Sequence, residues 1–129
     1  MLTAGNNDPL WDDAYANIYV YNAVANNILN VPDGTKEQRE AKYAEALVGR
    51  AFEYLNLVNI FGNHYDPATA ATDYGVPILL SEEVGDGASY VRNTVAEVYN
   101  QIMSDLKTAT PLLPEVATNV YHPNRTIGY

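Results

Sequence analysis

The sequence predicts an all-α protein, in which long amphipathic helices pack as antiparallel pairs and long loops join the remaining elements. Apolar residues recur every three or four positions in three separate stretches, as they do along one face of an α-helix. Each stretch starts at a residue typical of a helix N-cap. A short turn separates the first two stretches, which makes the helices on either side antiparallel neighbours.

The first helix is expected to begin at Asp8, the N-cap, with Pro9 at the first helical position. A proline is favourable there because its missing N–H would have no partner in any case. The turn sequence of residues 31–34 ends the helix. The predicted apolar stripe consists of Leu10, Trp11, Ala14, Tyr15, Ile18, Tyr21, Asn22, Ala25, Ile28 and Leu29.

The second helix is predicted to start after Thr35, which forms a capping box with Gln38, and to stop at Gly62. It would be roughly 40 Å long at about 1.5 Å per residue. Small residues around Gly49 would allow a neighbouring helix to approach closely. Its predicted stripe consists of Ala41, Ala44, Leu47, Val48, Ala51, Phe52, Leu55, Val58 and Phe61.

The third helix is predicted from Thr94, which forms a second capping box with Glu97, to about Thr110. Loops are expected at residues 63–73 and 81–90. Between them, residues 74–80 form a short apolar run that contains a proline, so we expect an extended segment lying on the helices rather than a central strand. The predicted stripe of the third helix consists of Val95, Val98, Tyr99, Ile102, Met103 and Leu106.

Composition excludes several classes of protein. The net charge is −9, with only seven Lys and Arg spread along 129 residues, so nucleic acid and anionic membrane surfaces are unsuitable partners. The absence of cysteine excludes disulfides, thiolate metal sites and thiol catalysis. No apolar run is long enough for a membrane span. We expect no cofactor, and we expect a segment excised from a longer, exported protein.

Three residues have predicted structural roles. Arg50 lies among small and apolar residues in the second helix, where an unpaired charge would be unfavourable. Asp105 in the third helix is its expected partner. Trp11 lies on the apolar stripe of the first helix, which favours packing in the core over a role as a sugar platform.

The candidate ligand site is the loop that follows the second helix. Sugars are bound by aromatic faces together with amide and carboxylate groups. This loop offers all three in Asn63, Tyr65, Asp66, Asp73 and Tyr74. The alternative interpretation is a set of solvated turn residues with one packing tyrosine.

Other polar residues favour ordinary surface roles. His64 and His122 are far apart in sequence and lack a second ligand at helical spacing, so no metal site is predicted. Glu82, Glu83 and Asp86 lie in a glycine-flanked loop. Catalysis of glycoside hydrolysis requires two carboxyls that face each other across a bond, one of them desolvated. We therefore interpret Glu82, Glu83 and Asp86 as solvated surface charges and not as catalytic carboxyls.

An ordered set of short phrases along the chain resembles a known family. The helix–turn–helix organisation, with Trp11 near the start of the first helix, is similar to that of tetratricopeptide units. No second segment repeats this pattern. The phrases are Trp11…Tyr15…Ile18…Asn22, then Arg50-Ala51-Phe52…Phe61-Gly62, Tyr74-Gly75-Val76-Pro77-Ile78, Arg92-x-Thr94-Val95-x-Glu97-Val98-Tyr99, Asp105-Leu106, Leu112-Leu113-Pro114 and Arg125-Thr126. In this order they resemble the N-terminal region of the SusD/RagB family of glycan-binding lipoproteins.

The resemblance implies a tetratricopeptide-like fragment of a larger SusD-like α fold, with residues 1–129 as an N-terminal domain. It implies a surface-exposed lipoprotein of the outer membrane whose lipidated cysteine is absent here. Members bind oligosaccharides or polysaccharides without catalysis, and act with a SusC-like TonB-dependent transporter in nutrient uptake. The alternative is a tetratricopeptide-like scaffold that mediates only protein–protein contacts.

Overall fold

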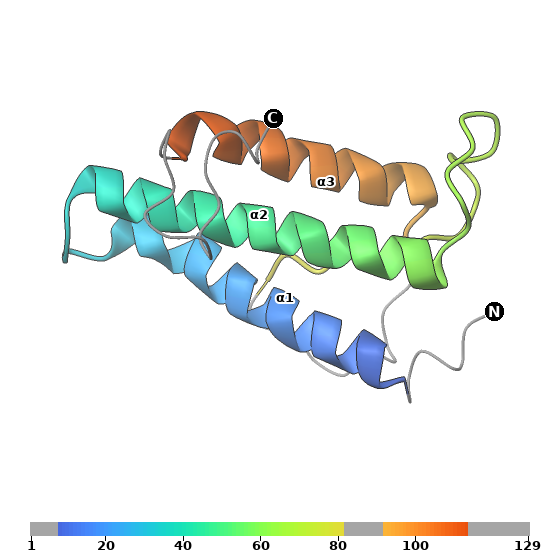
Figure 1. The fold of residues 1–129 in the computed structure, drawn as a ribbon, viewed down its shortest axis with the longest axis horizontal. Coiled ribbons are helices and arrows are strands. Elements are labelled where there is room, and N and C mark those ends of the chain that lie inside the picture. The colour runs from blue at the N-terminus through green and yellow to red at the C-terminus, as the bar shows by residue number, and fades with distance from the viewer. Residues whose placement is uncertain (1–7, 82–91, 114–129) are drawn as a thin grey trace.

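The computed structural model describes residues 8–81 and 92–113, and this part of the chain is helical. Its α-helices are α1 (Pro9–Asn27), α2 (Lys36–Phe61) and α3 (Val95–Ala109), and the short 3-10 helices η2 (Ile28–Asn30) and η4 (Thr110–Leu112) follow α1 and α3. α2 lies between α1 and α3 and runs antiparallel to both (Figure 1). The predicted all-α fold is therefore confirmed. None of the described helices combines the length and the apolar character needed to cross a membrane.

Each helix starts at the cap that the sequence predicts. The Asp8 carboxylate accepts a hydrogen bond from the Leu10 N–H at 2.9 Å. Reciprocal capping boxes open α2, between Thr35 and Gln38, and α3, between Thr94 and Glu97. Each box satisfies two N–H groups that have no partner inside the helix.

The predicted apolar stripes were too wide. α1 ends at Asn27, so Ile28 and Leu29 belong to η2 and not to the helix. Four residues assigned to stripes are exposed: Leu10, Leu29, Phe52 and Met103. The position of Met103 around the axis of α3 explains its exposure. The buried residues of α3 follow one narrow line along the helix, and Met103 lies one residue beyond it. That line consists of Val95, Val98, Ile102, Asp105 and Ala109.

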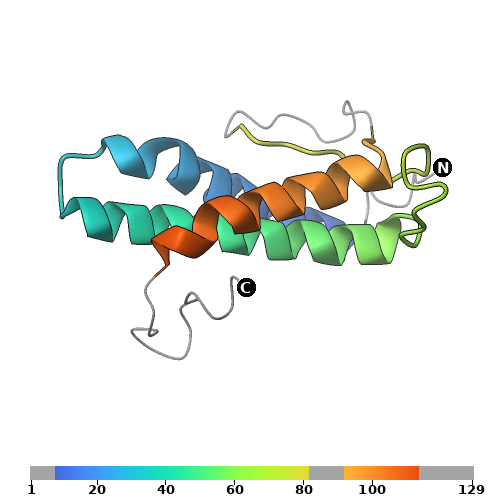
Figure 2. The same ribbon diagram turned by 90° about the horizontal axis from the view of Figure 1, so that it is seen from above.

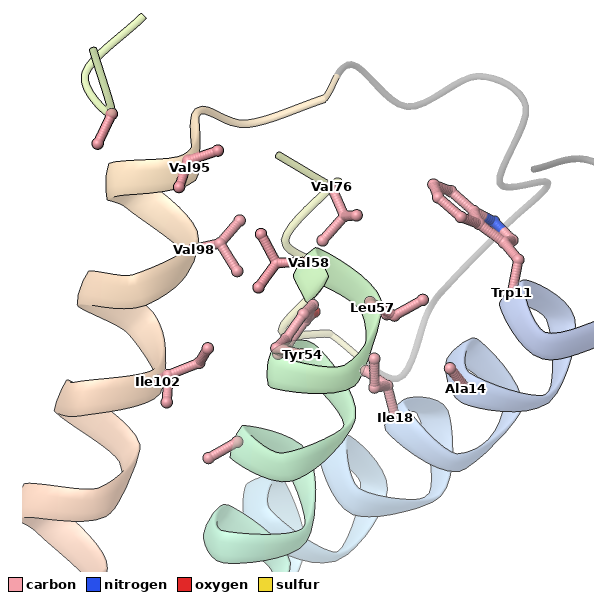
Figure 3. Close-up of a cluster of buried hydrophobic side chains, with 12 residues drawn as sticks. Trp11, Ala14, Ile18, Tyr54, Leu57, Val58, Val76, Val95, Val98 and Ile102 are labelled. Carbon is pink, nitrogen blue, oxygen red and sulfur yellow. The ribbon is translucent and has the colours of Figure 1, made fainter. Parts of the chain in front are cut away.

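The main core lies where all three helices and the segment after the loop converge (Figure 3). Trp11 lies in this core as expected, with its ring 5.1 Å from those of Tyr15 and Phe61. Val76 and Tyr54 are fully buried in it. A second cluster joins the other ends of the helices around Leu47, Val48 and Leu113.

A glycine permits the close contact between α1 and α2. A Cβ atom on Gly49 would overlap the ring of Tyr21. Small residues around Gly49 were expected to let a neighbouring helix approach α2 closely. In the structure that neighbour is α1, through Tyr21.

Residues 74–80 form the predicted extended segment along one face of the bundle (Figure 2). Its only β-type pairing in the described part of the chain is an isolated antiparallel bridge between Tyr74 and Thr94. Its other hydrogen bonds join it to side chains of α1 and α2 and to Arg92 and Asn93, just before α3. The segment therefore joins the loop end of the bundle to its polar centre.

Candidate functional site

A buried ion pair joins α2 to α3 at the centre of the molecule. The Arg50 guanidinium donates through Nε and Nη2 to the two carboxylate oxygens of Asp105, at 2.9 and 2.7 Å. Both side chains are buried, and the Gln101 amide also donates to Asp105 at 3.0 Å. The arrangement is the bidentate geometry in which arginine and carboxylate interact most strongly. It is the pairing that the sequence predicts for Arg50.

The same network fixes the extended segment. Asn22 is fully buried; its side-chain oxygen accepts from Arg50 at 3.0 Å, and its Nδ2 donates to the carbonyls of Leu79 and Ser81. The Tyr54 hydroxyl donates to the Leu79 carbonyl at 2.8 Å and accepts from the Leu79 N–H at 2.6 Å. Burial raises the pKa of Tyr54 to about 12. These groups satisfy one another, as buried polar groups must.

Tyr15 holds the segment one step nearer the loop. Its hydroxyl donates to the Pro77 carbonyl at 2.6 Å, and burial raises its pKa well above the usual range of tyrosine. The hydroxyls of Tyr15 and Tyr54 therefore act as fixed hydrogen-bonding groups of the scaffold.

At the loop end, backbone hydrogen bonds connect the loop to the start of α3. The N–H groups of Val95 and Ala96, which have no partner within the helix, donate to the carbonyls of Asp73 and Ala70 at 2.9 Å each. Asn63 and Tyr74 are joined across the base of the loop by a backbone bond of 3.1 Å. The loop thus has a defined shape set by the N-terminus of α3.

Arg92 holds the base of this loop against the end of α2. Its guanidinium donates to the carbonyls of Gly75 and Phe61 at 2.7 and 2.8 Å and lies 5.7 Å from the centre of the Tyr74 ring. A cation at the carbonyl end of a helix is favourable. The pKa of Arg92 is lowered because the guanidinium is partly buried. The neighbouring Tyr15 and Tyr74 offset part of this shift.

An open groove of about 340 Å³ lies between the loop and the outer face of α3. It is lined by Tyr65, Ala96, Tyr99, Asn100 and Met103. The rings of Tyr65 and Tyr99 meet edge to face, with their centres 5.0 Å apart. The Tyr99 hydroxyl donates to Asn59 of α2 at 3.2 Å, which fixes this ring from below. The groove therefore combines two aromatic rings in contact with each other, the exposed amide of Asn100 and the thioether of Met103.

The five predicted ligand residues divide into three groups. Tyr65, 53% exposed, lines the groove, whereas Tyr74, 64% exposed, packs against Arg92. Asp66 and Asp73 shape the loop: Asp66 accepts from the Ala68 N–H at 2.9 Å, and Asp73 accepts from the Thr69 hydroxyl at 2.6 Å. The exposed Asn63 contributes the backbone bond to Tyr74.

Sequence reasoning missed the α3 side of the groove. Tyr99 and Met103 were assigned to the buried stripe, and Asn100 received no role. A finer signal is present, because Ala96, Tyr99 and Met103 recur at spacings of three and four on a line next to the buried one. Ala96 and Tyr99 on this line are only partly buried and Met103 is exposed, so the line borders the groove as well as the core.

Two of the weaker expectations lie outside the described residues: His122, and the loop carboxylates Glu82, Glu83 and Asp86. His64 is exposed. Within residues 8–81 and 92–113, no three His, Asp or Glu side chains gather as they would around a metal ion.

Solved structures with the same fold include several bacterial proteins. A Bacteroides vulgatus protein, provisionally described as sugar binding, is 32% identical with a TM-score of 0.80, over 90% of this chain and 26% of its own. A SusD superfamily protein from Bacteroides thetaiotaomicron is 28% identical with a TM-score of 0.80, over 92% and 26%. A SusD-like carbohydrate-binding protein from Bacteroides vulgatus is 28% identical with a TM-score of 0.79, over 92% and 25%.

The chain therefore spans about a quarter of the length of the solved proteins that it matches. None of the curated proteins is significantly similar to it. The SusD-like family described as "starch-binding associating with outer membrane" matches residues 2–129. The predicted resemblance is thus confirmed, and the chain belongs to this SusD-like family.

Proposed function

We propose that this chain forms part of a surface that binds an oligosaccharide without catalysis, at the groove between the loop and α3. The whole protein would act at the outer-membrane surface in nutrient uptake, with a SusC-like TonB-dependent transporter as its partner. Its attachment to the membrane would be a lipid anchor outside residues 1–129, which form the N-terminal domain.

The paired rings of Tyr65 and Tyr99 carry this proposal. Sugars present C–H faces that pack on aromatic rings, and a ring whose position is already fixed loses little entropy on binding. Tyr99 is fixed by its hydrogen bond to Asn59. Beside it, the exposed Asn100 offers both a donor and an acceptor to sugar hydroxyls.

The loop residues take different parts in the proposed site. Tyr65 contacts the ligand in the groove, and the exposed Tyr74 with Asn63 extends the surface along the base of the loop. Asp66 and Asp73 keep the loop in shape, because one oxygen of each carboxylate accepts a hydrogen bond within the turn. This division supports binding over catalysis, which would need a facing pair of carboxyls.

The family description and the sugar-binding relatives support a glycan as the ligand. Because the chain spans about a quarter of those relatives, the remainder of a protein of that length would complete the site. The alternative is a scaffold that mediates only protein–protein contacts, and the groove between α1 and α2 supports it.

Isothermal titration of the full-length protein with a maltooligosaccharide and a laminarioligosaccharide tests the proposal. We expect one of them to bind, and we expect Tyr65→Ala and Tyr99→Ala each to weaken binding about tenfold, or about 1.4 kcal/mol. Tyr74→Ala should have a smaller effect. The control is Tyr19→Ala, since Tyr19 is an exposed tyrosine on α1, outside the groove. Absence of binding to both sugars, or equal loss in the control, would contradict the proposal.

A further inference from the structure

A second groove, of about 200 Å³, lies between the N-terminal half of α1 and the C-terminal half of α2. Its most exposed apolar side chains are Leu10 of α1 and Ile60 of α2, which are 59% and 56% exposed. Large apolar side chains that face one another across an exposed groove are typical of a contact surface. The whole lining consists of Leu10, Asp13, Ala14, Asn17, Glu53, Asn56, Leu57, Ile60 and Phe61.

The shape of this groove is that of a seat for one helix. The α1 wall runs from Leu10 to Asn17 and the α2 wall from Glu53 to Phe61. Each wall therefore covers about two helical turns. Two antiparallel helices form such a channel along their seam, and a third helix can insert its side-chain ridge into it.

The groove is negatively charged, and no cation of residues 8–81 and 92–113 pairs with its carboxylates. Asp13 forms no ion pair or hydrogen bond among the described residues. Glu53 accepts only from the Asn17 amide, at 3.2 Å. Burial raises the pKa of Glu53, and its bond to Asn17 lowers it. A carboxylate that is partly desolvated without a cation gains from a partner that supplies one.

The cations of the described chain lie elsewhere. Lys36, Arg39 and Lys42 belong to the opposite end of α2, about 16 Å or more along the helix from Glu53 at 1.5 Å per residue. Arg50 is buried against Asp105, Arg92 is engaged at the base of the loop, and Lys107 lies in the last turn of α3.

From these observations we propose that the α1–α2 groove docks a basic amphipathic helix of a partner protein. Apolar side chains of that helix, at spacings of three and four, pack between Leu10 and Ile60. Lysines or arginines at its edges reach Asp13 and Glu53. A second copy of this chain is a poor occupant, because a two-fold contact through this face would bring the same carboxylates together in a chain of net charge −9.

A synthetic peptide probe tests the proposal directly. The probe is an acetylated and amidated helix of about four turns, with leucines on one face and lysines at both edges. The control peptide has every lysine replaced by glutamate. Binding is followed by titration calorimetry and by the fluorescence of Trp11, whose ring lies 5.1 Å from that of Phe61 in the groove wall.

We expect the basic peptide to bind and to shift the Trp11 emission, and the acidic peptide to do neither. Ile60→Lys and the pair Asp13→Asn with Glu53→Gln should each weaken binding at least about tenfold. The matched controls, Val20→Lys on α1 and Glu40→Gln at the far end of α2, should change it less than about twofold.

Three results would overturn the proposal. Equal losses in the groove variants and the controls would show that the peptide responds only to the net charge of the chain. Unchanged binding after Ile60→Lys, with the circular dichroism of the variant intact, would place the contact elsewhere. Self-association of the chain that Ile60→Lys abolishes would assign the groove to a second copy.

Discussion

The polar residues at the centre of the bundle and those at its loop end are arranged in opposite ways. At the centre, Arg50 and Asp105 hold each other at 2.7 Å, and Asn22 and Tyr54 use their polar atoms on the extended segment. At the loop end, Tyr65 and Tyr74 are more than half exposed. Polar atoms at the centre are used in hydrogen bonds within the protein and offer little to a ligand. Side chains at the loop end are exposed and can contact one.

This contrast teaches how the scaffold positions the candidate site. The extended segment touches both regions, because Tyr15, Tyr54 and Asn22 hold its carbonyls and Arg92 holds its start at Gly75. The buried network thus determines where the loop begins and where α3 lies. Variants at the centre should change stability, and variants at the loop end should change binding.

The largest expected effect follows from removing one partner of the buried ion pair. Asp105→Ala leaves the Arg50 guanidinium buried without its carboxylate, and should lower the free energy of unfolding by about 3–5 kcal/mol. Urea denaturation followed by circular dichroism measures this loss. Should that variant fail to fold, Asp105→Asn keeps the shape and should lose less.

The pair between the exposed Lys42 and the partly exposed Glu45, at 3.3 Å, is the control. Lys42→Ala should change stability by less than about 1 kcal/mol. Replacing both buried partners, with Arg50→Met and Asp105→Leu together, should recover much of the loss, since no charge is then stranded. A loss from Asp105→Ala no larger than that from Lys42→Ala would contradict a structural role for the pair.

The next effect compares two tyrosine hydroxyls. Tyr54→Phe leaves the N–H of Leu79 without its partner and removes one of the two donors to the Leu79 carbonyl, which keeps Asn22; it should lower stability by about 1–3 kcal/mol. Tyr99→Phe removes an exposed hydrogen bond to Asn59 and should lower it by less than about 0.5 kcal/mol. Equal losses in the two variants would remove the distinction between the regions.

Alkaline pH should act through the buried tyrosines. Burial raises the pKa of Tyr54 from 10.0 to about 12, and that of Tyr15 in the same direction. A pKa that is higher in the folded state contributes stability that is complete below the unfolded value of 10.0 and is lost as pH rises toward the folded one. Unfolding free energies measured between about pH 8 and pH 12 should fall above about pH 10.

Tyr54→Phe should make this fall shallower, because one of the two buried hydroxyls is then gone. Tyr19→Phe, at an exposed position, should leave the profile unchanged. A steep fall of equal size in all three proteins would show that other groups dominate the alkaline loss.

Local signals explain why much of the fold could be predicted. The two residues of each capping box lie three positions apart, so a few consecutive residues are enough to predict the start of the helix. These pairs are Thr35 with Gln38 and Thr94 with Glu97. The pairing of Arg50 with Asp105 could be predicted over 55 residues because a buried arginine requires a carboxylate.

The candidate site could be predicted only on its loop side. Tyr65 and Tyr74 belong to a loop whose composition suggests sugar binding, but Tyr99 meets Tyr65 only after α3 packs beside the loop. In the same way, the partner of Tyr54 lies 25 residues away in a segment without regular structure. Contacts of this kind depend on tertiary packing and leave no periodic pattern in the sequence.

The smallest effect concerns the two capping boxes and separates the loop end from the rest of the bundle. Thr94→Ala and Thr35→Ala each remove one cap and should lower stability by about 1 kcal/mol. Only Thr94 lies at the loop, where it pairs with Tyr74 and precedes the N–H groups of Val95 and Ala96 that bind loop carbonyls. Thr94→Ala should therefore speed hydrogen exchange at these two amides and weaken glycan binding a few-fold, whereas Thr35→Ala should do neither. Similar exchange and affinity in the two variants would mean that the groove does not depend on the N-terminus of α3.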